Sequence, residues 1–199
     1  MKKKEIKYLT SDEVKQFLTT VKKGGSVRDL LYFNLLFHYG LRASEGLGIE
    51  LEAIKPSPEY AVEIFIHRLK NGISRHYPVR QDDAKLLKLW LRKRKKLPNA
   101  KHNKYLFVTA HSHLSHMSLQ MVSKLTGRYS TEAGLEKVKE SSHVFRHSCA
   151  ISLLLKNFDI HFVKNWLGHK DIASTLIYTE YAPAQWKEMS QKAINSAFD

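Results

Sequence analysis

The stretch His143-Val144-Phe145-Arg146-His147 is followed by Leu167-Gly168-His169 and then by Ile177-Tyr178-Thr179. Because His143 and Arg146 are three residues apart, a helix would carry their side chains on one face, about a turn apart. Residues 148–156 are apolar with small side chains, which predicts a buried helix that fixes this face. We therefore expect the last quarter of the chain to form a buried helix that holds a cluster of reactive side chains in place, and the rest of the fold to be arranged around it.

These side chains suit chemistry on a phosphate group. The Arg146 guanidinium is a planar fork that fits two phosphate oxygens. A phenol such as that of Tyr178 is a covalent nucleophile only where its pKa is lowered from an ordinary value of about 10. We expect arginine and imidazole groups beside Tyr178 to lower this pKa.

The three motifs, in this order, resemble the second motif box of the tyrosine recombinase (phage integrase) family. That box reads H-x-x-R-H, then L-G-H, then the nucleophile in I-Y-T, as Tyr178 stands nine residues after His169 here. The resemblance implies that Tyr178, His143, Arg146 and His169 are catalytic, with His143 as the acceptor of the phenol proton.

The family's first box, G-L-R-x-S-E, is similar to residues 40–45, which contain Arg42 and Glu45. From the residues alone, an Arg42–Glu45 ion pair that closes a turn is the simpler interpretation. The resemblance implies instead that Arg42 binds a phosphate and that Glu45 orients it. Gly46 and Gly48 stand where the family has helix formers, so we expect a looser turn after Arg42.

The family also has a catalytic lysine in the turn between two strands. Lys70-Asn71-Gly72 lies between two predicted strands, and Asn-Gly is a strong hairpin signal. A lysine in a turn is ordinarily a solvated charge. The resemblance implies that Lys70 is catalytic, and we expect Arg68 and Arg75 to contact the DNA backbone beside it.

The predicted fold is α+β, mainly α-helical with a small three-stranded antiparallel sheet, as in the DNA breaking-rejoining fold of these catalytic domains. Helices are predicted over residues 10–21, 28–39, 81–97, 119–125, 131–139, 148–156 and 181–197, from apolar spacing and capping patterns. The strands are predicted over 49–54, 61–67 and 73–79, from alternating apolar residues. We expect one catalytic domain over residues 1–199, with no separate N-terminal DNA-binding domain. A helix over 181–197 either closes its own core or packs on a neighbouring subunit.

The composition favours a polyanionic partner. The chain has 33 Lys and Arg against 19 Asp and Glu, a formal net charge of +14. Residues 68–104 alone hold 13 basic and 2 acidic residues, so the excess is concentrated as in a nucleic-acid footprint. No apolar run approaches the roughly 20 residues of a membrane span, and we expect no secretory signal, because no apolar stretch follows the first lysines. The single Cys149 fits a reducing cytoplasm.

We expect neither a metal nor a cofactor. Asp82 and Asp83 are explained as acids at a helix start, and His111, His113 and His116 lie in a loop without cysteine or acid partners. Arginines aimed at a phosphate can stabilise the charge that a metal would otherwise neutralise.

The resemblance implies a site-specific recombinase that cleaves and rejoins double-stranded DNA through a 3′-phosphotyrosyl intermediate and assembles as a tetramer on its sites. Residues 66–72 and 146–149 look like those of the small fimbrial phase-variation invertases. Inversion, integration and excision stay open. Two alternatives are a type IB topoisomerase-like relaxing enzyme and a non-enzymatic DNA-binding regulator on the same scaffold. Tyr181 is a rival nucleophile to Tyr178.

Overall fold

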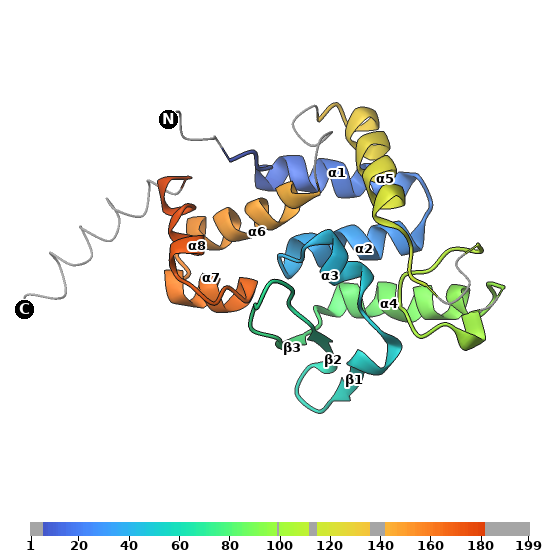
Figure 1. Cartoon of the computed structure of the whole chain (residues 1–199). Helices are drawn as coiled ribbons and strands as arrows, with labels where there is room; N and C mark the ends of the chain where they lie inside the picture. Colours follow the sequence, from blue (N-terminus) through green and yellow to red (C-terminus); the bar gives the residue numbers. More distant parts are fainter. Residues whose placement is uncertain (1–5, 99, 112–114, 136–141, 182–199) are drawn as a thin grey trace, which may run out of the picture.

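The computed structural model describes residues 6–98, 100–111, 115–135 and 142–181 (Figure 1). Its elements, in chain order, are α1 (Ser11–Lys23), α2 (Val27–His38), α3 (Ala43–Leu47), the 3₁₀ helix η1 (Leu51–Ala53), β1 (Ile54–Ser57), β2 (Ala61–Ile66), β3 (Arg75–Pro78), α4 (Gln81–Arg94), η2 (Ala100–His102), α5 (Leu119–Glu132), α6 (His143–Leu155), α7 (Ile160–Leu167), α8 (Ala173–Leu176) and η4 (Thr179–Tyr181). The predicted class, mainly helical with a small sheet, is confirmed. The predicted helix over 181–197 lies almost wholly outside the described residues.

Helix α2 forms the centre of the molecule. It packs against α1, α4 and α6, and Figure 1 shows α6 and α4 on opposite sides of it. Its side chains are apolar almost all round, and Leu31, Tyr32, Phe33 and Leu36 are fully buried. A helix that is apolar on every face must be covered on every face, so the sequence prediction of a central core helix is confirmed.

The N-terminus of α1 is fixed by a capping box, as predicted. The Thr10 hydroxyl accepts a hydrogen bond from the backbone N–H of Glu13 at 3.3 Å, and the Glu13 carboxylate accepts one from the Thr10 N–H at 2.8 Å. Val14, Phe17 and Val21 then form the buried stripe of the helix. Two donors that a helix start leaves unpaired are satisfied in this way.

The sheet has three antiparallel strands in the order β1-β2-β3, which confirms the predicted sheet. The predicted first strand over 49–54 was wrong, because β1 begins only at Ile54. Ile49 and Glu50, just before η1, pair elsewhere: Glu50 forms a bridge with Tyr105, the N–H of Leu106 donates to the Ile49 carbonyl, and that of Leu51 donates to the Lys104 carbonyl. Pro56 lies inside β1, where it is tolerated because β1 is an edge strand.

Helix α5 is continuous through Gly127, whereas the sequence predicted two helices separated there. Val122, Leu125, Thr126 and Tyr129 are buried on one face at helical spacing, so packing on both sides of Gly127 outweighs its low helix propensity. The second predicted helix falls largely outside the described residues.

Among the described residues, no helix is both long enough and apolar enough to cross a bilayer.

Candidate active site

The carboxylate of Glu45 is fully buried and lies among three guanidinium groups. Its oxygens accept hydrogen bonds from Arg42 Nη1 at 2.5 Å and from Arg68 Nη1 at 3.0 Å, and Arg146 Nη1 lies 3.7 Å away. Burial alone would raise the pKa of Glu45, but the Arg42 N–H and the charges of Arg68 and Arg146 outweigh it, so the pKa is lowered. The expected Arg42–Glu45 pair therefore exists, and the same carboxylate also holds two further arginines.

Arg68 is not at the surface, contrary to the expectation that it contacts DNA. Its side chain is 0% exposed, and it donates to the carbonyls of Tyr39 and Trp166 at 2.9 and 2.7 Å and to the Tyr77 hydroxyl at 2.9 Å. A guanidinium enclosed by these acceptors cannot reach a DNA phosphate. The sequence pattern could not show that the segment after β2 turns the Arg68 side chain inward.

Lys70 lies in the connection between β2 and β3, as predicted. Lys70 and Asn71 both have positive φ, 56° and 58°, and the Gly72 N–H donates to the Leu69 carbonyl at 3.2 Å, so the two residues form the centre of a tight turn. The Lys70 side chain is exposed. Arg75 on β3 is half-buried, and its expected contact with DNA stays a prediction.

Two glycines bring this turn against the turn that follows α7. The N–H of Ile73 donates to the Gly168 carbonyl at 3.0 Å. A Cβ on Gly72 would lie 2.8 Å from the Gly168 carbonyl oxygen, and one on Gly168 would lie 2.7 Å from Arg68 Cγ. Only residues without a side chain permit this approach, which places the Lys70 turn beside the His169 segment.

Helix α6 supplies His143 and Arg146 from its first turn. Arg146 is buried, and its Nη1 and Nη2 donate to the carbonyls of Gly40 and Leu167 at 2.5 and 2.9 Å. Burial, followed by the charges of Arg42 and Arg68, lowers the Arg146 pKa to about 10, so the group stays charged at neutral pH. A guanidinium has five N–H donors, so these two bonds leave donors for a further oxygen ligand.

His143 is exposed, and its pKa is lowered by partial burial and by the charges of Arg146, Arg42 and Lys70. His169 is buried and pairs through Nδ1 with the Thr175 hydroxyl at 2.8 Å. Burial and the charges of Arg146, Arg42 and Arg68 lower the His169 pKa to about 3. Both imidazoles are therefore neutral at neutral pH, and each retains one N–H donor.

Tyr178 is 2% exposed, and its hydroxyl lies 2.9 Å from Nδ1 of His147. The expected lowering of its pKa was wrong: burial raises it to about 12, although the charges of Arg146 and Arg42 act in the lowering direction. The hydrogen-bonded imidazole is His147, whereas the sequence interpretation chose His143. The signal for His147 was its position four residues after His143, which puts both rings on one helix face.

The charges of these groups influence one another's pKa values, although the groups come from segments far apart in the sequence. The charges of Arg42 and Arg146 each lower the pKa of His143, His169 and Tyr178, and the charge of Lys70 also lowers that of His143. Tyr181, the rival nucleophile, accepts a hydrogen bond from the Ile6 N–H at 2.8 Å. Within the described part of the chain, no group of three or more His, Cys, Asp or Glu side chains forms a metal-binding cluster.

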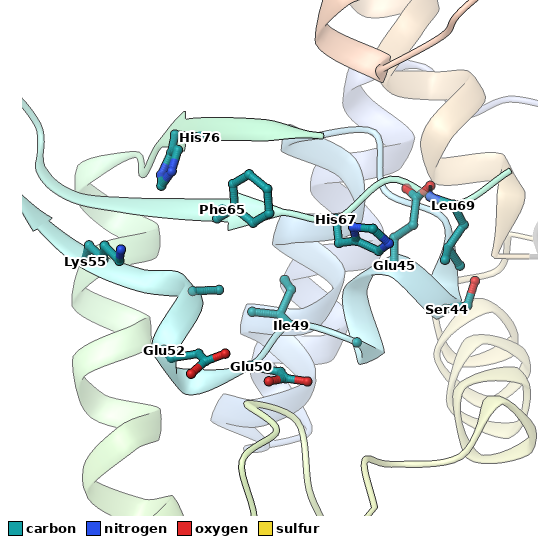
Figure 2. A pocket seen from close by; sticks show the side chains of 12 residues that line it. Ser44, Glu45, Ile49, Glu50, Glu52, Lys55, Phe65, His67, Leu69 and His76 are labelled. Carbon is teal, nitrogen blue, oxygen red and sulfur yellow. Dashed lines mark hydrogen bonds between the residues drawn. The ribbon is translucent and has the colours of Figure 1, made fainter. Parts of the chain in front are cut away.

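A cavity of about 680 Å³ borders this site on the sheet side. Figure 2 shows Glu45 and Leu69 at one end of it, with Phe65 and His76 farther along the strands and Glu50 and Glu52 on the opposite wall. Its lining does not include Arg42, Lys70 or Arg146. The phosphate-binding candidates therefore do not face this cavity.

Comparisons with known proteins agree on one family. The sequence profile described as the phage integrase family matches residues 7–185. The type 1 fimbriae regulatory protein FimE of Escherichia coli K12 is 28% identical over 174 residues, which are 87% of this chain and 85% of that protein. The tyrosine recombinase XerA of Pyrococcus furiosus is 30% identical over 188 residues, which are 94% of this chain and 62% of that protein.

Among solved structures, the XerH site-specific recombinase in its post-cleavage complex with palindromic difH substrate matches with a TM-score of 0.80 and 25% identity. The match covers 94% of this chain and 53% of that chain, so this chain corresponds to about half of that recombinase.

Proposed function

Since this chain belongs to the phage integrase family, we propose that it is a site-specific recombinase that cleaves and rejoins double-stranded DNA. It acts in the cytoplasm, as a catalytic domain that self-associates on its recombination sites. Inversion, integration or excision then depends on how two sites are arranged. The observation that supports the proposal is that Arg42 and Arg146 act on the pKa of Tyr178, His143 and His169, while Lys70 acts on that of His143.

In the proposed reaction, the Tyr178 oxygen attacks a scissile phosphorus, and the bond from phosphorus to the 5′-oxygen breaks. A 3′-phosphotyrosyl link forms, and Lys70 donates the proton that the 5′-hydroxyl needs. The phenol proton passes to His143, which is exposed and whose lowered pKa leaves the imidazole neutral at neutral pH. The covalent link conserves the energy of the phosphodiester, so a 5′-hydroxyl from another strand can reverse the step.

Arg42 and Arg146 bind the non-bridging oxygens and stabilise the charge that develops in the pentavalent transition state. Glu45 supports this role, since one buried carboxylate contacts both guanidinium groups and limits their movement. His169 donates its free ring N–H to the same phosphate, while Thr175 holds its other nitrogen. Preorganised donors of this kind need no reorientation during the reaction.

The test uses nicked substrates made from DNA of the native locus. After cleavage, the short fragment that carries the 5′-hydroxyl dissociates, so the strand cannot be rejoined and the covalent adduct is trapped. We expect the parent protein and Tyr181→Phe to form a protein–DNA adduct and Tyr178→Phe to form none, as seen on a denaturing gel. An adduct with Tyr178→Phe but not with Tyr181→Phe would reverse the assignment of the nucleophile.

A plasmid assay, together with the covalent trap, separates the alternatives. Relaxation of any supercoiled plasmid without products from paired sites would select a topoisomerase-like enzyme. DNA binding without any adduct on cognate DNA would select a non-enzymatic regulator.

A further inference from the structure

Among the described residues, His147 makes the one hydrogen bond of the Tyr178 hydroxyl, and no step of the proposed reaction uses it. Its Nδ1 lies 2.9 Å from the phenol oxygen, and the two rings are tilted by 53° with centroids 5.6 Å apart. The imidazole is half-buried on α6. The contact therefore joins a half-buried imidazole to a buried phenol through one defined pair of atoms.

The imidazole of His147 and the guanidinium of Arg146 leave α6 in different directions, because consecutive residues on a helix point about 100° apart. Arg146 is directed at the Gly40 and Leu167 carbonyls. His143, one turn earlier, stacks on His147 with ring centroids 5.8 Å apart. The phenol thus lies next to His147, one helical turn from His143.

The surroundings of Tyr178 keep it buried and protonated. The ring packs in a cluster with Cys149, Leu154, Val163 and Leu167 and is 2% exposed. Burial and the charges of His143 and Arg146 lower the pKa of His147 to about 4, whereas burial raises that of Tyr178 to about 12. His147 is therefore neutral and the phenol protonated at neutral pH, so the two groups can share one hydrogen bond.

We propose that His147 is a positioning residue: its Nδ1 holds the Tyr178 hydroxyl in a buried resting position, which the phenol must leave before it can attack DNA. The proposal rests on the proposed role of Tyr178 as the nucleophile. Once released from His147, the phenol gives its proton to His143, as in the proposed reaction.

The first test needs no DNA. N-acetylimidazole acetylates accessible tyrosine hydroxyls, and mass spectrometry measures the reaction at Tyr178 and, as an internal reference, at Tyr181. His147→Phe keeps a ring but removes the acceptor, and we expect Tyr178 to react roughly tenfold faster, as the loss of one hydrogen bond implies. His147→Asn places an amide oxygen where Nδ1 lies, and we expect it to restore the protection of the parent protein.

Two outcomes of this test would overturn the proposal. Tyr178 in His147→Phe could remain as protected as in the parent protein. Alternatively, His147→Asn could expose Tyr178 as much as His147→Phe does, which would mean that ring packing rather than the hydrogen bond holds the phenol.

A second measurement does not depend on the folding of the Phe variant. Nitrogen-15 NMR of the parent protein reports which ring nitrogen of His147 carries the proton. We expect the proton on Nε2, with the Nδ1 signal changing in Tyr178→Phe. A proton on Nδ1 would make the phenol the acceptor and contradict the proposal.

A third measurement separates positioning from proton transfer. With nicked DNA at saturation, we expect His147→Phe to form the covalent adduct at least as fast as the parent protein. A loss of about a hundredfold or more with unchanged DNA binding would mean that His147 takes the proton during attack. If the parent protein forms no adduct on any DNA, the proposed recombinase function fails, while the acetylation result still decides the role of His147.

Discussion

At the scale of single residues, the Glu45 carboxylate has the largest effect on the site. It lies fully buried within hydrogen-bond or ion-pair distance of Arg42, Arg68 and Arg146, and it also accepts the Leu69 N–H at 3.1 Å. Removing its charge would leave three guanidinium groups close together without a counterion. Buried like charges of this kind are costly unless they are paired.

We therefore predict that Glu45→Gln lowers the free energy of unfolding by about 3 kcal/mol or more. Urea denaturation followed by circular dichroism measures this value. The matched control is Glu132→Gln on α5, whose carboxylate lies 3.7 Å from Arg128 at the surface, and we expect a change within about 0.5 kcal/mol there. Equal losses in the two variants would contradict the role given to Glu45.

The depressed pKa values of His147 and His169 predict how stability depends on pH. The folded forms titrate near 4 and 3, whereas an unfolded histidine titrates near about 6.5. Below pH 6.5 the unfolded chain therefore binds protons that the folded chain does not, so the free energy of unfolding falls as the pH falls. Above this pH the contribution is fully present.

Urea titrations between pH 7 and 5 test this linkage in a range where few carboxylates titrate. We expect His169→Asn to show a shallower decline with falling pH than the parent protein, and a variant at the exposed His161 to follow the parent. Parallel slopes for all three proteins would show that His169 is not buried in its neutral form.

The pKa of Tyr178 could not be predicted from the sequence, although its place in the site could. The family resemblance implied that Arg42, Lys70, His143, Arg146, His169 and Tyr178 share one site. In the structure, Arg42 and Arg146 affect the pKa of His143, His169 and Tyr178, and Lys70 affects that of His143. The direction of the Tyr178 pKa depends on burial, which outweighs the nearby positive charges. Burial is a property of packing between α6, α7 and η4, and no local pattern states it.

At the scale of elements, helices with a continuous apolar stripe and a cap were predicted to within a few residues, as for α1 and α4. Errors arose where the deciding contact is distant in sequence. The alternating pattern at 49–53 correctly indicated extended backbone at its start, but its hydrogen-bond partner is the segment 104–106. Pairing between segments so far apart is not contained in either segment alone.

The contact between the Lys70 turn and the turn after α7 predicts a strong effect of Gly168→Ala. A Cβ there would overlap Arg68 and the Ile73 carbonyl, and φ is +70°, which disfavours any L residue. We expect a loss of stability above about 1 kcal/mol and slower covalent adduct formation, because the Lys70 turn would be displaced.

Two glycines provide controls for this variant. Gly134 has φ of +67° with no atom within 4 Å of an added Cβ, so Gly134→Ala measures the backbone strain alone. Gly127 lies inside α5 with open space, and we expect Gly127→Ala to stabilise the protein by about 0.5–1 kcal/mol. If Gly134→Ala costs as much as Gly168→Ala, close approach of the two turns is not the cause.

At the scale of the whole molecule, the net charge of +14 makes binding to a polyanion strongly dependent on salt. Composition predicted this partner class, but not which basic side chains face it. Lys70 adjoins the candidate site, whereas Lys88 is an exposed residue of α4, which lies across α2 from α6 (Figure 1).

We predict that Lys70→Ala makes the negative slope of log affinity against log salt concentration less steep by about one, because one phosphate contact is lost. Fluorescence anisotropy with a labelled duplex at several salt concentrations measures this slope. Lys88→Ala is the charge-matched control, and we expect its slope to equal that of the parent protein. A slope that becomes less steep in Lys88→Ala and not in Lys70→Ala would place the DNA on the α4 side.

Main-chain oxygens hold two of the arginines around Glu45. The carbonyls of Gly40 and Leu167 accept from Arg146, and those of Tyr39 and Trp166 accept from Arg68. A substitution at Leu167 or Trp166 changes a side chain but cannot delete the acceptor, provided that the chain follows the same path. Many substitutions around the site can therefore accumulate during evolution while Arg146 and Arg68 keep their hydrogen-bond acceptors. Insertions, deletions and prolines alter the backbone path itself, so we expect them to be selected against in these segments.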